Sequence, residues 1–92
     1  MSGFRLLVDF EALEFIWGLP SSVARRIRRK LEEILNDPSR HCEYIEIDRD
    51  GRQCGGYIWD KYAFTYWVDH ADRHIKVLKV RLADSRTFSE RK

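Results

Sequence analysis

The sequence predicts an α+β fold in which two helices cover one face of a mostly antiparallel sheet. An apolar stripe at helical spacing runs through residues 23–35, and apolar side chains recur at every second position through residues 62–68. An aromatic hairpin of this kind needs a cover, because an isolated hairpin is only marginally stable in water. At 92 residues and 43% hydrophobic content the chain is suited to one compact core. We expect one domain over residues 3–83 and a polar tail at 84–92.

The first half of the chain predicts a short strand followed by a helical hairpin. Residues 4–8 (FRLLV) form the strand, and Asp9 can cap a helix in which Phe10, Leu13 and Trp17 lie at helical spacing. A second helix begins near residue 21 and ends before Pro38, since the residue before a proline avoids the α region. The face of this helix opposite its apolar stripe carries five cations, Arg25, Arg26, Arg28, Arg29 and Lys30.

The second half predicts three or four antiparallel strands. Residues 43–48 alternate in polarity, and the pair Asp50–Gly51 predicts a hairpin turn into a strand at 53–59. Gly55 and Gly56 mark a bulge or a close approach of the backbone. The aromatic strand at 62–68 then turns at residues 69–73 into a last strand at 75–80.

Charge and cysteine content limit the possible functions. The net charge of +2 argues against a strong nucleic-acid binder by total charge, although local clusters of cations remain candidates. Two cysteines and no leader-like N-terminus favour reduced thiols and a cytoplasmic location. No apolar run reaches the ~18–20 residues that span a bilayer. We also expect no metal and no cofactor, because no Cys or His pair has a complete zinc-site spacing.

Two groups of cations are candidates for binding phosphate or an acidic partner. Arg81, Arg86, Lys61 and Arg52 lie at predicted strand ends and could line a phosphate-binding concavity, or could serve only solubility and edge protection. The cluster at 25–30, with Arg25 and Arg29 as its partner-binding candidates, could bind RNA or an acidic protein, or could be a solvated helix face.

The aromatic residues allow two interpretations. Trp59, Tyr62, Tyr66 and Trp67 could form a stacking platform for single-stranded nucleic acid, or a core beneath the helices. Trp67 points to the opposite face from Tyr62 and Tyr66, so an uncovered face would make Trp67 part of a partner interface.

The strings WDKYAFTYWVD at 59–69 and IKVLKV at 75–80 resemble the RelE/ParE toxin superfamily of bacterial toxin–antitoxin systems, as do residues 8–12 and 34–38. The resemblance covers about residues 4–83. It implies a cytoplasmic toxin, in a plasmid-stabilisation type of system, that is bound by an antitoxin protein. Its target would be ribosome-bound mRNA, which it would cleave, or DNA gyrase. A catalytically inert binding module of the same fold is the alternative.

The resemblance also bears on catalysis. RNA-cleaving members have an arginine after the tyrosine of the long strand and another shortly after the last strand, where this chain has Ala63 and, near the second place, Ala83. An arginine positions and stabilises a scissile phosphate through its bidentate fork. Among neighbouring cations, Arg81, Lys61 and Arg86 are the candidates for catalysis, and Arg52 and Arg81 for binding phosphate.

Overall fold

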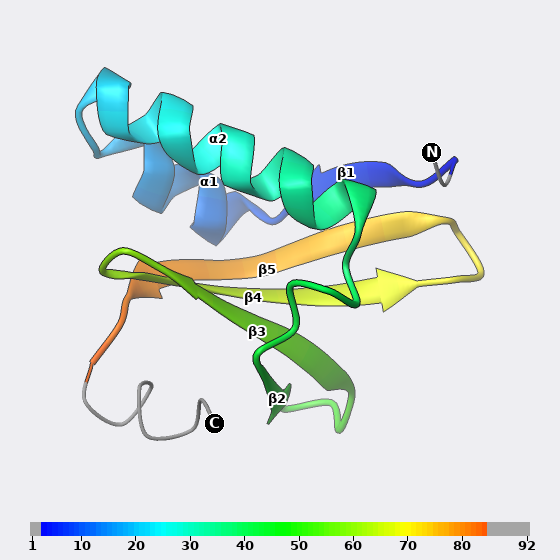
Figure 1. Cartoon of the computed structure of the whole chain (residues 1–92). Helices are drawn as coiled ribbons and strands as arrows, with labels where there is room; N and C mark the ends of the chain where they lie inside the picture. Colours follow the sequence, from blue (N-terminus) through cyan, green and yellow to red (C-terminus); the bar gives the residue numbers. More distant parts are fainter. Residues whose placement is uncertain (1–2, 85–92) are drawn as a thin grey trace.

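The structure, a computed structural model, describes residues 3–84 and contains two helices and five strands (Figure 1). Strand β1 (Arg5–Val8) leads into α1 (Phe10–Trp17) and α2 (Ser21–Asn36). Four strands follow, β2 (Tyr44–Ile47), β3 (Gln53–Trp59), β4 (Tyr62–Asp69) and β5 (His74–Leu82). The predicted order of elements is confirmed. Within the described residues, no helix has the length and apolarity needed to cross a membrane.

All five strands belong to one mixed sheet in the order β1-β5-β4-β3-β2. Strands β2 to β5 pair antiparallel, whereas β1 adds to the edge of β5 in parallel. The sheet is therefore wider than the three or four antiparallel strands predicted for the second half alone. The parallel pairing sets Leu6 beside Ile75 and Val8 beside Val77, so the apolar side chains of the first strand join the core.

Both helices lie on the same side of the sheet (Figure 1). The main core lies between them and the sheet, where Phe64 and Val77 are fully buried against Ile27 and Ile34 of α2. Tyr62 and Tyr66 are also buried, at 4% and 2% exposure, which excludes them from an exposed stacking platform. The prediction that the aromatic strands form a core beneath the helices is confirmed for these two residues.

The prediction that Phe10 and Trp17 belong to the buried face of α1 is wrong. Ala12 is the buried residue of this helix, whereas Phe10 and Trp17 are 64% and 66% exposed and pack edge-to-face on each other. A small side chain at position 12 lets the helix approach the sheet closely, which turns Phe10 and Trp17 toward solvent. Asp9 precedes the helix as predicted, but its side chain makes no capping hydrogen bond.

The sheet face away from the helices, here called the open face, carries a second and smaller apolar cluster. Tyr44, Ile58 and Ala63 are buried in it. The ring of Tyr44 lies directly over Gly56, which confirms the predicted close approach at this glycine. The irregularity of the ladder lies instead in β4, between Thr65 and Tyr66.

Candidate functional site

Two of the predicted phosphate-binding cations, Lys61 and Arg81, lie at the end of the sheet where β4 begins and β5 ends. Arg81 is paired with Ala63 across the β4–β5 ladder, and residues directly opposite in an antiparallel pair share a face. The guanidinium of Arg81 is therefore on the open face, where its Nη1 donates to the Leu82 carbonyl at 3.3 Å. The Lys61 carbonyl accepts a hydrogen bond from the Ala83 amide at 2.8 Å. This end thus holds two cations beside the last strand. Arg86 lies outside the described residues.

The two alanines that the sequence resemblance sets at the places of arginines, Ala63 and Ala83, pack together. Ala63 is 0% exposed in the cluster with Tyr44 and Ile58, and Ala83 packs against the same cluster. The volume next to these positions is thus filled by a tyrosine ring and an isoleucine side chain. An RNA phosphate that approaches this part of the open face meets apolar packing, with Arg81 as the adjacent cation.

The prediction that Arg52 joins Arg81 in one concavity is wrong. Arg52 precedes β3 and lies over Trp67, near the far end of β4 from Lys61. The five residue steps from Tyr62 to Trp67 correspond to roughly 16 Å along the strand. Asp48 holds Arg52 there, since the guanidinium Nε donates to the Asp48 carboxylate at 2.7 Å. The backbone amide and then the side chain of Arg52 lower the pKa of Asp48.

Trp67 is half-buried on the open face between two cations. The guanidinium carbon of Arg52 is 4.6 Å from the centroid of its ring, and Lys76 Nζ is 5.2 Å from it. Lys76 is in turn paired with Asp69 at 2.9 Å. Through these two cations the indole contacts the residue before β3 and a residue of β5. Its predicted part in a partner interface stays a prediction.

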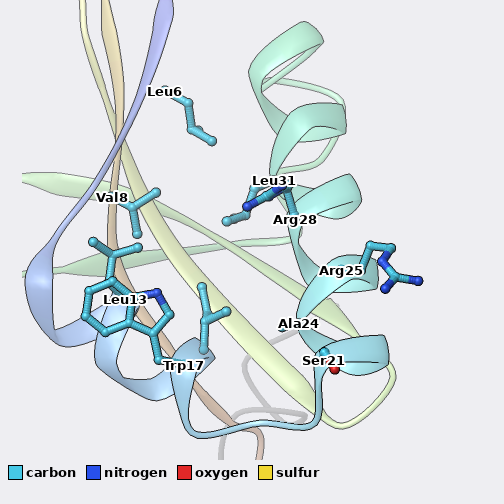
Figure 2. A pocket seen from close by; sticks show the side chains of 10 residues that line it. Leu6, Val8, Leu13, Trp17, Ser21, Ala24, Arg25, Arg28 and Leu31 are labelled. Atoms are coloured by element: carbon cyan, nitrogen blue, oxygen red, sulfur yellow. The ribbon is translucent and has the colours of Figure 1, made fainter.

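On the other side of the sheet, a groove of about 360 Å³ runs between β1 and the two helices (Figure 2). Alternate residues of β1, Leu6 and Val8, line one wall because they point to the same face of the strand. The remaining apolar walls are formed by Leu13, Ile16 and Trp17 of α1 and by Ala24 and Leu31 of α2. Arg25 and Arg28 of α2 belong to the lining as well, and Figure 2 shows Arg28 extending toward the groove. An apolar floor with a basic rim suits a segment that is apolar on one side and acidic on the other.

Helix α2 separates the two predicted partner-binding arginines. Arg25 lines the groove, whereas Arg29 lines a second hollow with Arg26, Lys30, Glu33 and Trp59 on the other flank of the helix. The sequence showed the cations but not this division, because it depends on how α2 is rotated against the sheet. The groove itself was missed. The alternation of Leu6 and Val8 in the first strand was its only visible signal.

Within residues 3–84, no three His, Cys, Asp or Glu side chains are grouped so that they could hold a metal ion. Cys42 is half-buried and Cys54 is buried, and both are free thiols. Burial is the main cause that raises the pKa of the Cys54 thiol, which disfavours its reactive thiolate.

Solved structures were found that share this fold over nearly the whole chain, whereas no family model and no curated protein sequence matches. A mutant E. coli toxin RelE in complex with an antitoxin RelBc peptide superposes with a TM-score of 0.72. It is 26% identical, and the alignment covers 98% of this chain and 94% of that one. The isolated E. coli RelE toxin gives a TM-score of 0.71 at 25% identity over 96% of this chain and 94% of that one.

The chain belongs to the RelE toxin superfamily. The archaeal RelE of the RelE–RelB complex from Pyrococcus horikoshii shares the fold at lower identity, with a TM-score of 0.69 and 18% identity over 89% of this chain and 96% of that one. The expected resemblance is thus confirmed at the level of the superfamily. In this RelE-superfamily chain, Ala63 and Ala83 pack in the small apolar cluster of the open face.

Proposed function

We propose that this chain is the toxin component of a type II toxin–antitoxin pair and that an antitoxin protein binds it. The observation that carries this proposal is the likeness to RelE over at least 94% of both chains, including one RelE structure in complex with an antitoxin peptide. The groove adds a physical reason to expect a protein partner. It joins an apolar floor to an edge strand, β1, whose outer edge pairs with no other strand among residues 3–84.

The groove is the seat that we assign to the antitoxin. Burial of apolar side chains against Leu6, Val8 and Leu31 would supply most of the binding free energy, because apolar burial is the main favourable term in association. Carboxylates on the same antitoxin segment would pair with Arg25 and Arg28 at the rim. Neither arginine has a carboxylate within ion-pair distance among the described residues of its own chain.

The target that we favour is translation, through cleavage of ribosome-bound mRNA. Arg81 supports this choice, since its guanidinium lies on the open face directly beside Ala63, so the neighbouring strand supplies a cation next to the place of a family arginine. Lys61 at the same end of the sheet would neutralise a second phosphate oxygen. In this proposal Arg81 and Lys61 stabilise charge at the scissile phosphate, with Arg86 as a third candidate from outside the described residues.

The packed alanines favour a second candidate function, in which the fold acts by binding alone. With Ala63 and Ala83 in an apolar cluster, two positions of an RNA-cleaving site hold no charge. A toxin that inhibits DNA gyrase, or an inert module that binds a protein, requires neither arginine. Unlike the first candidate, neither of these functions includes cleavage of a translated message by the purified protein.

Two linked measurements test the proposal. Induced expression of the chain in a bacterial host should arrest growth, and co-expression of the small protein encoded next to it should restore growth. In a reconstituted translation reaction, the chain should cut the message at the ribosome, and Arg81→Ala should lower the cleavage rate at least tenfold. Arg49→Ala, in the exposed turn before β3, is the control and should cleave as the wild type does.

Each outcome has a different meaning. Normal growth at high expression would contradict a toxin. Growth arrest without cleavage, together with loss of gyrase supercoiling activity, would assign gyrase as the target. Unchanged cleavage by Arg81→Ala would remove Arg81 from the site.

A further inference from the structure

The flank of α2 that faces away from the groove gathers cations around one aromatic ring. The guanidinium carbon of Arg26 is 5.2 Å from the centroid of the Trp59 ring, and Lys30 Nζ is 5.7 Å from it. Arg29 joins them in a hollow of about 260 Å³. We call these four residues, Arg26, Arg29, Lys30 and Trp59, the Trp59 flank. Behind the indole, Tyr62 is stacked with an interplanar angle of 22°, so the ring is held in place from the side of the core.

The position of these charges within α2 is unfavourable for the isolated helix. Five cations lie between residues 25 and 30, in the first ten residues of the helix, and no acidic residue precedes Glu32. Like charges three or four positions apart destabilise a helix, and Arg25–Arg29 and Arg26–Arg29 are pairs at this spacing. Among the described residues, only Lys30 of the five has a carboxylate within ion-pair distance, Glu33 at 3.3 Å. Such a charge cluster is better explained by an external anion than by the stability of the helix.

The surroundings of the Trp59 flank indicate which anion it would bind. Apart from the indole, the hollow is lined only by charged side chains, Arg26, Arg29, Lys30 and Glu33, so it offers no apolar floor to a protein segment. It shares Glu33 with a neighbouring polar hollow, whose other lining residues are Asn36, Asp37, Arg40 and His41. A row of cations with an aromatic ring among them is the pattern that tracks the phosphates of a nucleic-acid strand.

We propose that the Trp59 flank binds the phosphodiester backbone of a single-stranded nucleic acid. Arg26, Arg29 and Lys30 would contact phosphates, and the two cations over Trp59 would leave the indole as they do so. This surface is distinct from the Arg81 end of the open face, because Trp59 packs on the helix side of the sheet. The inference does not depend on whether the chain is a toxin, since it concerns binding and not cleavage or growth arrest.

The test measures the salt dependence of binding with two matched double variants of the same helix. The purified full chain is titrated against a labelled 12-nucleotide oligouridine between 50 and 200 mM salt. The flank variant Arg26→Gln/Arg29→Gln and the groove variant Arg25→Gln/Arg28→Gln remove the same charge from adjacent positions. Each phosphate contact contributes about 0.7 to the slope of log affinity against log salt for a single strand, so the flank variant should lose about 1.4. The groove variant should keep the wild-type slope.

Tryptophan fluorescence locates the bound strand. Binding should change the emission of the wild type and of Trp17→Phe but not that of Trp59→Phe, because the cations leave only the Trp59 ring. An oligodeoxythymidine of equal length determines whether the strand is RNA or DNA. Tighter binding of the oligouridine would show that the Trp59 flank prefers RNA. Equal binding of the two strands would show that it recognises the phosphodiester backbone that they share.

Three results would overturn the proposal. One is an absence of binding by the wild type at 50 mM salt, and another is an equal loss in the two double variants. The third is that an oligoglutamate of equal charge binds as tightly and with the same dependence on Arg26 and Arg29, which would assign the flank to an acidic polypeptide.

Discussion

Gly56 and Ala63 are small because the ring of Tyr44 lies over this part of the open face. A Cβ atom at Gly56 would lie 2.2 Å from Cε2 and Cζ of that ring, and Ala63 is fully buried in the same cluster. An arginine at position 63 would therefore need the tyrosine to move. Ala63 is thus part of a packed unit with Tyr44, which the sequence pattern alone does not predict.

This packing makes Gly56→Ala destabilising. We expect the free energy of unfolding to fall by about 1–3 kcal/mol, the usual cost of overpacking a core, because the buried Tyr44 ring has little room to shift. Gly18→Ala is the control, since a Cβ there meets only carbonyl oxygens at 3.6 Å or more and the residue is already in the right-handed helical region. Urea denaturation measures the free energy of unfolding of both variants and of the wild type. Equal stability of the two variants would show that the ring does not pack on Gly56.

The elements that sequence patterns predicted best are α2 and β4, because each has a long apolar repeat with a single period. The extent of helix α1 was predicted correctly, but the face that it buries was not. The helix has only eight residues, its apolar side chains are spread over two faces, and the buried face is centred on Ala12. Arg52 was misplaced because its position depends on Asp48, four residues away across a turn. Such local ion pairs redirect long side chains in ways that strand order alone does not reveal.

The β4–β5 hairpin makes a pH-dependent contribution to stability. Asp69 accepts a hydrogen bond from Lys76 at 2.9 Å and another from the backbone amide of Asp72, and Lys76 is the main cause that lowers the pKa of Asp69. A carboxyl whose pKa is lower in the folded state stabilises the fold above its unfolded-state pKa, and loses this effect as the pH falls through the folded-state value.

The variant Asp69→Asn tests this contribution. It should be less stable than the wild type at pH 7, and the difference should narrow below about pH 4, where the unfolded-state carboxyl begins to protonate. Chemical denaturation from pH 3 to pH 7 measures the difference. If the difference in the free energy of unfolding stays constant with pH, the titration of Asp69 does not contribute to the pH dependence of stability.

At the scale of the whole molecule, helix α2 and the sheet together separate three surfaces of different chemistry. The groove with Arg25 and Arg28 lies on one flank of α2, and the Trp59 flank lies on the other. The open face with Arg81 lies across the sheet. Sequence patterns predicted the layers of the fold because they follow from periodicity. They did not predict the groove, which requires β1 to pair with the last strand and so depends on contacts between opposite ends of the chain.

The most direct test of the central claim measures growth with a variant that fills the groove. Ala24→Arg places a long side chain among the groove walls without removing any buried contact, whereas Ser22→Arg adds the same side chain to an exposed position of α2 outside it. Both variants should arrest growth when expressed alone. The neighbouring antitoxin should rescue cells that express the wild type or Ser22→Arg but not those that express Ala24→Arg. Full rescue of Ala24→Arg would contradict the groove as the antitoxin site, and the absence of growth arrest by the wild type would contradict the toxin itself.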